Sequence, residues 1–170
     1  MDKISKDEIL DLVDDNDNVI GTILRAENQE KRTKNTRVVH CLVINSEGKL
    51  WIPRRSADKK TYPLGLDFSA SGYVSAGETY EEAVKREVSE ELNIDIFKVD
   101  FKEKAYLSPF KDNTSHFIKL YEIRTDETPN YNQQDFTEAF WLTPAELNER
   151  IQRRESAKGD LKYLLKRFYL

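Results

Sequence analysis

The chain has 170 residues, 38% of them hydrophobic and 34% charged, so we expect one domain, residues 1–170, with a core of ordinary size. Its 27 basic and 31 acidic residues give a net charge of −4, which excludes a strongly basic nucleic-acid-binding protein and an acidic disordered tail. Its single cysteine, Cys41, excludes an intramolecular disulfide framework and a zinc site built from cysteines.

The start of the chain is polar and acidic, and it lacks the apolar segment of a secretory signal. No apolar run elsewhere approaches the roughly twenty residues that a membrane-spanning helix needs. We therefore expect a reduced, cytoplasmic protein that does not contact membranes.

The first expected element is an N-terminal hairpin over residues 8–25. Its strands, residues 8–13 and 19–25, flank a turn that is rich in Asp and Asn, two residues that favour turns. The connector that follows, residues 26–36, is highly charged. We expect this connector to be mobile.

The next strands are apolar segments bounded by turn residues. They are expected at residues 38–44, 49–53, 66–74, 104–107, 117–123 and 139–142. The first of them is apolar almost throughout, as in a strand that is buried on both faces of a sheet.

Helices are expected between and after these strands, and residues 79–92 form the clearest one. A short helix should begin after Thr143, because Thr at the N-cap and Pro144 at the first helical position are typical of a helix start. The last helix, residues 160–169, has Asp160 as its expected cap and leucines at helical spacing. A mixed sheet with such helices places the chain in the α/β or α+β class.

The most informative segment, residues 72–94, reads GYVSAGETYEEAVKREVSEELNI. At about 100° per residue, Glu87, Glu90 and Glu91 fall within one arc of roughly 100° beside the apolar stripe of the helix. Arg86 borders this arc and can form an ion pair with Glu90 at i+4. The glutamates therefore flank the buried face of the helix instead of lying opposite it.

Carboxylates gathered this closely repel one another, and the Glu87–Glu91 pair costs about a few tenths of a kcal/mol even in water. A solvated acidic face is the ordinary interpretation of such a helix. A divalent cation such as Mg²⁺ binds oxygen ligands and removes the repulsion. Gly72 and Gly77 allow a tight loop ahead of the helix, and such a loop can offer a backbone carbonyl to the metal.

The segment resembles the Nudix box. That pattern consists, in order, of Gly, five residues, Glu, seven residues, Arg-Glu, an aliphatic residue, any residue, Glu-Glu, any residue, Gly and an aliphatic residue. The matching residues are Gly72, Glu78, Arg86, Glu87, Val88, Glu90, Glu91 and Ile94. Asn93 stands where the pattern has its last Gly, a mild departure because Asn also tolerates the left-handed conformation of a helix C-cap.

The resemblance to the Nudix family implies an α/β/α sandwich around a mixed sheet. It also implies hydrolysis of a pyrophosphate bond in a nucleoside diphosphate derivative or another small organic diphosphate, with Mg²⁺ or Mn²⁺ as the cofactor. The implied metal ligands are Glu87, Glu90, Glu91 and, through its carbonyl, Gly72. Arg86 and Glu78 would orient these ligands, and Glu87 or Glu91 would assist the removal of a proton from water.

A second resemblance, carried by residues 54–63 and 13–25, is to isopentenyl-diphosphate isomerases and isomerase-like Nudix hydrolases. In those proteins the corresponding Arg and Lys contact diphosphate. The resemblance therefore makes Arg55 and Lys59, with the adjacent Arg54, candidates for substrate binding. The alternative role for this basic loop is solubility alone.

The isomerase reaction needs a catalytic cysteine and histidine metal ligands. Aligned through the box, this chain has Ser71 at the cysteine position and Tyr73 and Thr36 at histidine positions. A serine hydroxyl does not easily replace that thiol, because its pKa is too high. A hydrolase is therefore favoured, with an isomerase and a non-hydrolysing nucleotide-binding module as the alternatives.

Several further polar residues have weaker signals. His40, His116 and Cys41 lie in or beside apolar strands and are expected to be structural. Glu138 or Asp135 lies where several Nudix enzymes place an extra acidic ligand or base. The sequence leaves the choice between a monomer and a homodimer open.

Overall fold

The computed structural model describes residues 7–170, so the chain start that bears on secretion lies outside the described residues. The strands are β1 (Ile9–Val13), β2 (Val19–Leu24), β3 (Arg37–Ile44), β4 (Leu50–Arg55), β5 (Ala70–Tyr73), β6 (Asp100–Leu107), β7 (Phe117–Arg124) and β8 (Phe136–Leu142). The helices are α1 (Arg25–Lys31), α2 (Tyr80–Leu92), the short 3₁₀ helix η1 (Ile96–Lys98), α3 (Pro144–Gln152) and α4 (Gly159–Phe168). Within residues 7–170, every helix is too short or too polar to span a bilayer.

A six-stranded mixed sheet forms the centre of the fold, in the order β6-β7-β3-β4-β8 with β5 paired to β3. The central strand β3 runs parallel to β7 and antiparallel to β4 and β5. Strands β3 and β4 pair at Ile44 and Leu50, beside the turn that joins them. Residues 38–41, on the same edge of β3, pair with β5. Gly72 of β5 therefore lies opposite Val39, and Ser71 lies opposite His40.

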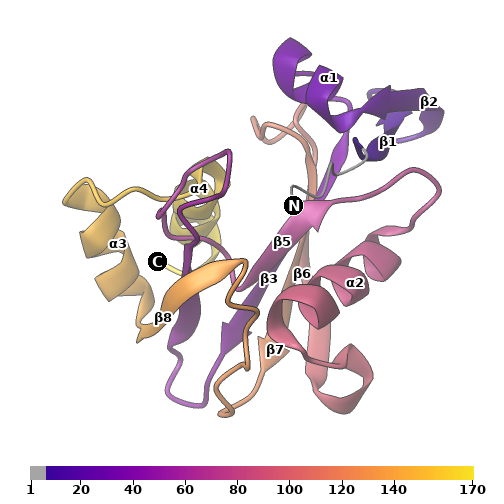
Figure 1. The fold of residues 1–170 in the computed structure, drawn as a ribbon. Helices are drawn as coiled ribbons and strands as arrows, with labels where there is room; N and C mark the ends of the chain where they lie inside the picture. Colours follow the sequence, from indigo (N-terminus) through magenta and orange to yellow (C-terminus); the bar gives the residue numbers. More distant parts are fainter. Residues whose placement is uncertain (1–6) are drawn as a thin grey trace.

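The side chains of β3 alternate between two hydrophobic clusters, and every residue of β3 after Arg37 is buried. Val39 and Val43 belong to the cluster that contains the apolar face of α2. Val38 and Leu42 belong to the cluster that contains the leucines of α3 and α4. Helix α2 accordingly covers one face of the sheet, and α3 and α4 cover the other (Figure 1). The expected sandwich, with a central strand buried on both faces, is confirmed.

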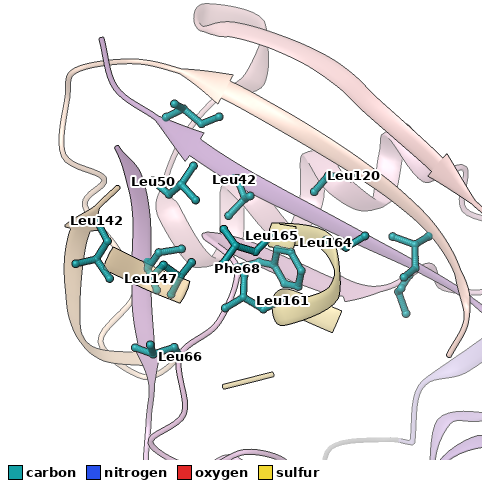
Figure 2. Close-up of a cluster of buried hydrophobic side chains, with 14 of the residues drawn as sticks. Leu42, Leu50, Leu66, Phe68, Leu120, Leu142, Leu147, Leu161, Leu164 and Leu165 are labelled. Carbon is teal, nitrogen blue, oxygen red and sulfur yellow. The ribbon is translucent and has the colours of Figure 1, made fainter. Parts of the chain in front are cut away.

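The leucine stripe of the last helix fills the second cluster. Figure 2 shows this cluster, whose labelled members from α4 are Leu161, Leu164 and Leu165. The helix has Lys158 at its N-cap, so the prediction that Asp160 caps it is wrong. The Asp160 carboxylate instead contacts His40 Nε2 at 3.3 Å and accepts a hydrogen bond from the Ser115 hydroxyl at 3.3 Å.

The connector expected to be mobile contains a helix, α1, which lies with the β1–β2 hairpin at one end of the sheet (Figure 1). Its charges follow helical spacing, and Glu27 and Lys31 form an i,i+4 ion pair at 2.5 Å. Asn28, on the same helix, is buried. The prediction of a mere connector is wrong for this part of the chain, because its Ala, Glu, Gln and Lys residues favour a helix.

The strand expected over residues 66–74 is shorter than predicted, because only residues 70–73 pair with β3. Leu66 instead forms isolated bridges with Arg54 on β4 and with Ala157 just before α4. The segment between Leu66 and β5 therefore connects β4, α4 and β5. This connection brings parts of the chain that are distant in sequence to one edge of β3.

Candidate active site

Helix α2 carries the three glutamates of the box and is fixed at both ends. Thr79 Oγ1 accepts a hydrogen bond from Glu82 N–H at 3.1 Å, and Glu82 Oε2 accepts one from Thr79 N–H at 2.8 Å. At the other end Asn93 has φ 53, the left-handed conformation expected of it. Val84 and Val88 are buried against the sheet. The rotation of the helix about its axis is thereby set, with Glu87 and Glu91 beside β5.

Glu87 lies directly over the backbone of β5 at Gly72. A Cβ atom at position 72 would be 2.0 Å from Glu87 Oε1 and 2.3 Å from its carboxyl carbon. A side chain at this position would therefore displace the carboxylate. The glycine at this position therefore leaves the space that the Glu87 carboxylate occupies.

Arg86 joins the loop before α2 to the carboxylates. Its guanidinium donates to Glu78 at 2.8 and 3.0 Å, to Glu87 at 2.6 Å and to the carbonyl of Tyr73 at 3.1 Å. Although burial raises the pKa of Glu78, the hydrogen bonds from Arg86 hold it below its usual value. Glu90 lies 3.7 Å from the same guanidinium, so the expected i,i+4 pair is confirmed, but its side chain is 61% exposed.

Glu91 is buried, and its Oε1 accepts a hydrogen bond from the backbone N–H of Ser71 at 3.1 Å. Burial raises the pKa of Glu91 well above its usual value, and the charges of Glu87 and Asp67 raise it further. Burial also raises the pKa of Glu87, although Arg86 opposes this effect. Among residues 7–170, Arg86 forms an ion pair with Glu87, whereas no cation forms one with Glu91. Glu91 therefore carries an electrostatic cost that its surroundings do not offset.

Arg54, the first cation of the basic loop (residues 54–63), lies between two carboxylates. It donates to Glu138 and to Glu155, at 2.6 Å each, and to the carbonyl of Leu64 at 3.0 Å. Glu138, the candidate extra acid, thus pairs with Arg54 across the β4–β8 ladder.

The other two candidate substrate-binding cations are paired in the same way. Arg55 donates to the buried Asp67 at 2.5 Å and to the carbonyl of Thr61 at 2.9 Å. Lys59 donates to Asp135 at 2.6 Å. A phosphate group that binds to either cation must share it with a carboxylate of the chain.

Comparison with known proteins identifies the family of this chain. The NUDIX domain family matches residues 34–166. The chain belongs to the Nudix family. It is 52% identical over 162 residues to an uncharacterized Nudix hydrolase of Nostoc sp., covering 95% of this chain and 96% of the relative. A crystal structure of a Deinococcus radiodurans protein is 47% identical with a TM-score of 0.92, covering 96% of this chain and 100% of that one.

The predicted Nudix fold and hydrolase class are therefore confirmed. An isopentenyl-diphosphate Delta-isomerase of Paenarthrobacter aurescens is 28% identical over 155 residues, covering 88% of this chain and 84% of the relative. That identity is well below the 52% shared with the Nostoc hydrolase. The family assignment therefore rests on the hydrolases, with the isomerases as distant relatives.

The Nudix box residues converge on one side of β5. Arg86 donates to both Glu78 and Glu87, Glu87 lies against Gly72, and Glu91 joins them through Ser71 and Glu87. Within residues 7–170, no three His, Cys, Asp or Glu side chains are already arranged around a common point as a finished metal site. A metal ion would therefore require the glutamates to reorient.

Sequence reasoning missed two residues that lie beside these glutamates. Asp67 is 2% exposed, and its charge contributes to the raised pKa of Glu91. Lys158 donates to the hydroxyl of Ser71 at 2.5 Å and lies 3.7 Å from Asp67. The position of Asp67 between Leu66 and Phe68 was a usable signal, since a carboxylate inside an apolar segment needs a partner. Lys158 had no comparable local signal.

The two histidines and the cysteine of this Nudix chain are packed inside it. His40 is stacked on Phe68 with ring centroids 3.9 Å apart, and Cys41 is fully buried, as expected for structural residues. Burial lowers the pKa of His116 to about 4. Thr36, at one of the isomerase histidine positions, contacts His116 Nδ1 at 3.0 Å. Thr36 therefore holds the His116 ring in place and has no imidazole of its own to bind a metal.

Proposed function

We propose that the protein is a Mg²⁺-dependent Nudix hydrolase that cleaves the pyrophosphate bond of a nucleoside diphosphate derivative or another small organic diphosphate. Mn²⁺ is the alternative cofactor. The observation that carries the proposal is the Glu87–Glu91 pair, which is buried beside a glycine whose lack of a side chain makes room for it. These two carboxylates repel each other when both are ionised, and a bound divalent cation would relieve that repulsion.

The residues present fit a hard divalent metal. All side chains that would hold it, Glu87, Glu90 and Glu91, offer carboxylate oxygens, and the Gly72 carbonyl adds a backbone oxygen. The raised pKa of Glu91 supports a cation at this position, because a positive charge beside the carboxylate would lower that pKa. When bound, the metal would supply charge neutralisation for the phosphates and a lower pKa for an attacking water.

The remaining box residues hold the ligands in position. Arg86 fixes Glu78 and Glu87 through hydrogen bonds of 2.6 to 3.0 Å, and the backbone of Ser71 fixes one oxygen of Glu91. Glu87 or Glu91 would accept a proton from the water that attacks phosphorus. Arg54, Arg55 and Lys59 would contact the diphosphate by exchanging a carboxylate partner for a phosphate oxygen, with Glu138 or Asp135 as an additional acid.

A hydrolase is preferred to an isomerase because this chain lacks the groups of the isomerase reaction. Ser71 has a hydroxyl that is bonded to Lys158, and Tyr73 has its ring under Arg25 at 5.1 Å from the guanidinium carbon. We further propose that residues 1–170 act as one cytoplasmic domain, as a monomer or homodimer, without binding nucleic acid or membranes. The net charge of −4 supports the absence of a nucleic-acid partner.

A substrate panel tests the proposal. The purified protein would be incubated with nucleoside diphosphate sugars, dinucleoside polyphosphates, nucleoside di- and triphosphates and isopentenyl diphosphate, with Mg²⁺, Mn²⁺ or EDTA. We expect metal-dependent release of phosphate or a nucleotide from at least one nucleotide substrate. A protein that turned over isopentenyl diphosphate alone would support the isomerase. A protein that bound nucleotides without cleaving any would support the non-hydrolysing module.

A further inference from the structure

Lys158 is held at a defined place by its backbone. Its N–H donates to the carbonyl of Leu66 at 2.9 Å, and the neighbouring Ala157 bridges to the same residue. These contacts form where the chain enters α4, at the N-cap of that helix. Because they use backbone atoms alone, the lysine side chain is not needed to maintain them.

The ammonium of Lys158 is connected to the carboxylates of the box through a single residue. Lys158 Nζ donates to Ser71 Oγ at 2.5 Å, while the backbone N–H of Ser71 donates to Glu91 Oε1 at 3.1 Å. Asp67, whose charge acts on Glu91, lies 3.7 Å from the same ammonium. Lys158 and Glu91 therefore contact the same residue, Ser71, one through its hydroxyl and the other through its backbone N–H.

Lys158 is less neutralised than the cations of the basic loop. Among the described residues, the hydrogen bond from its ammonium goes to a hydroxyl and not to a carboxylate. Its nearest carboxylate, Asp67, already accepts hydrogen bonds from Arg55 at 2.5 Å and from the N–H of Phe68 at 2.7 Å. An ammonium has three donors, so Lys158 retains capacity for a further acceptor. Its side chain is 24% exposed, which leaves it accessible to a ligand.

We propose that Lys158, held by Ser71, binds the diphosphate group of the substrate on the side of Ser71 away from Glu91. This inference rests on the proposed function, because it takes the ligand to be a diphosphate placed against Glu87 and Glu91. A lysine suits this task as a compact positive charge that can reach phosphate oxygens not held by a metal. Its ion pair with Asp67, at 3.7 Å, is longer than the 2.5 to 2.6 Å ion pairs of Arg54, Arg55 and Lys59, so a phosphate oxygen displaces a weaker partner.

The test compares Lys158→Met with Lys162→Met, which removes the same charge from an exposed position on the same helix. Methylene diphosphonate, a diphosphate analogue that is not hydrolysed, would be titrated calorimetrically into each protein with Mg²⁺ present. We expect Lys158→Met to weaken binding by about tenfold to a hundredfold, as for a lost hydrogen bond to a charged group. The KM of the best panel substrate should rise similarly, with a smaller change in kcat.

Further measurements separate this role from a structural one. Binding of Mn²⁺ alone should be unchanged in Lys158→Met, and Lys158→Arg should restore part of the affinity for the diphosphonate. Equal affinities of Lys158→Met and Lys162→Met in an active enzyme would overturn this inference and leave the proposed function intact. A wild-type protein that neither bound Mn²⁺ nor cleaved any panel substrate would overturn both. If Lys158→Met unfolded, Lys158→Gln would be measured in the same way.

Discussion

The box glutamates of α2 and the basic loop after β4 both concentrate like charges, but within residues 7–170 the chain pairs every candidate cation of the loop and leaves Glu91 of the box without a cation. Each candidate cation of the loop, Arg54, Arg55 and Lys59, donates to a carboxylate within 2.6 Å. Among the described residues, Glu91 has no ion-pair partner, and burial raises its pKa. Ion pairs therefore stabilise the charges of the loop, whereas the charge of Glu91 on the helix is not stabilised in this way.

This difference indicates which of the two regions is constrained by function. A buried carboxylate without a cation lowers stability, and such costs are concentrated at functional sites. A buried carboxylate with a cation, such as Asp67 with Arg55, is compatible with an ordinary structural role. The comparison predicts that substitutions on α2 change turnover more than stability, and that substitutions in the loop do the reverse.

The largest effect is expected at the glutamates themselves. Glu87→Gln or Glu91→Gln should lower turnover by at least about a hundredfold, because each removes a charged oxygen ligand or the proton acceptor. The melting temperature in EDTA should be unchanged or higher, since repulsion is relieved. Turnover and thermal unfolding would be measured with Glu81→Gln, exposed on the same helix, as the control. A variant that unfolded would show that the carboxylates are structural, and the comparison would fail.

The next effect is expected at Gly72, which tests the same site without changing a charge. Gly72→Ala would place a Cβ atom 2.0 Å from Glu87 Oε1 and so displace that carboxylate. We expect turnover to fall by about tenfold to a hundredfold, because a misplaced catalytic group can cost up to roughly a hundredfold. Gly21→Ala is the matched control, since a Cβ there meets nothing within 4 Å. Equal turnover of the two variants would mean that the position of Glu87 is unimportant.

In the basic loop, the largest effect should come from Arg55. Arg55→Met leaves Asp67, whose side chain is 3% exposed, without its strongest partner. We expect the free energy of unfolding to fall by about 2 kcal/mol, the cost of an uncompensated buried charge partly offset by Lys158. Urea denaturation would measure it, and Asp67→Asn in the same background should recover part of the loss. Unchanged stability with a raised KM would instead show that Arg55 acts mainly on substrate.

The box glutamates and the basic loop also differed in how well sequence predicted them. Spacing along one helix sets the neighbours of Glu87, Glu90 and Glu91, so the acidic arc and the Arg86–Glu90 pair were predictable. The sandwich and the doubly buried β3 followed from hydrophobic patterning in the same local way.

The partners of the loop were not predictable by such reasoning. Arg54 pairs with Glu155, and Lys59 pairs with Asp135, across segments that only the folded sheet brings together. Lys158 reaches Ser71 for the same reason. The start of α4 was misplaced because Asp160 is used by His40 and Ser115, a tertiary contact that overrides its capping preference.

The smallest effect is expected at Lys59, where a pair of variants sharpens the comparison. The Lys59–Asp135 ion pair is about one-quarter exposed, so Lys59→Met should change the free energy of unfolding by less than about 1 kcal/mol. If phosphate competes with Asp135 for the ammonium, Lys59→Met should raise KM by about two- to fivefold and Asp135→Asn should lower it. Steady-state kinetics of both variants at two ionic strengths would show this. Opposite shifts mean that Asp135 holds Lys59 back from the substrate, whereas parallel losses mean that the pair acts as one structural unit.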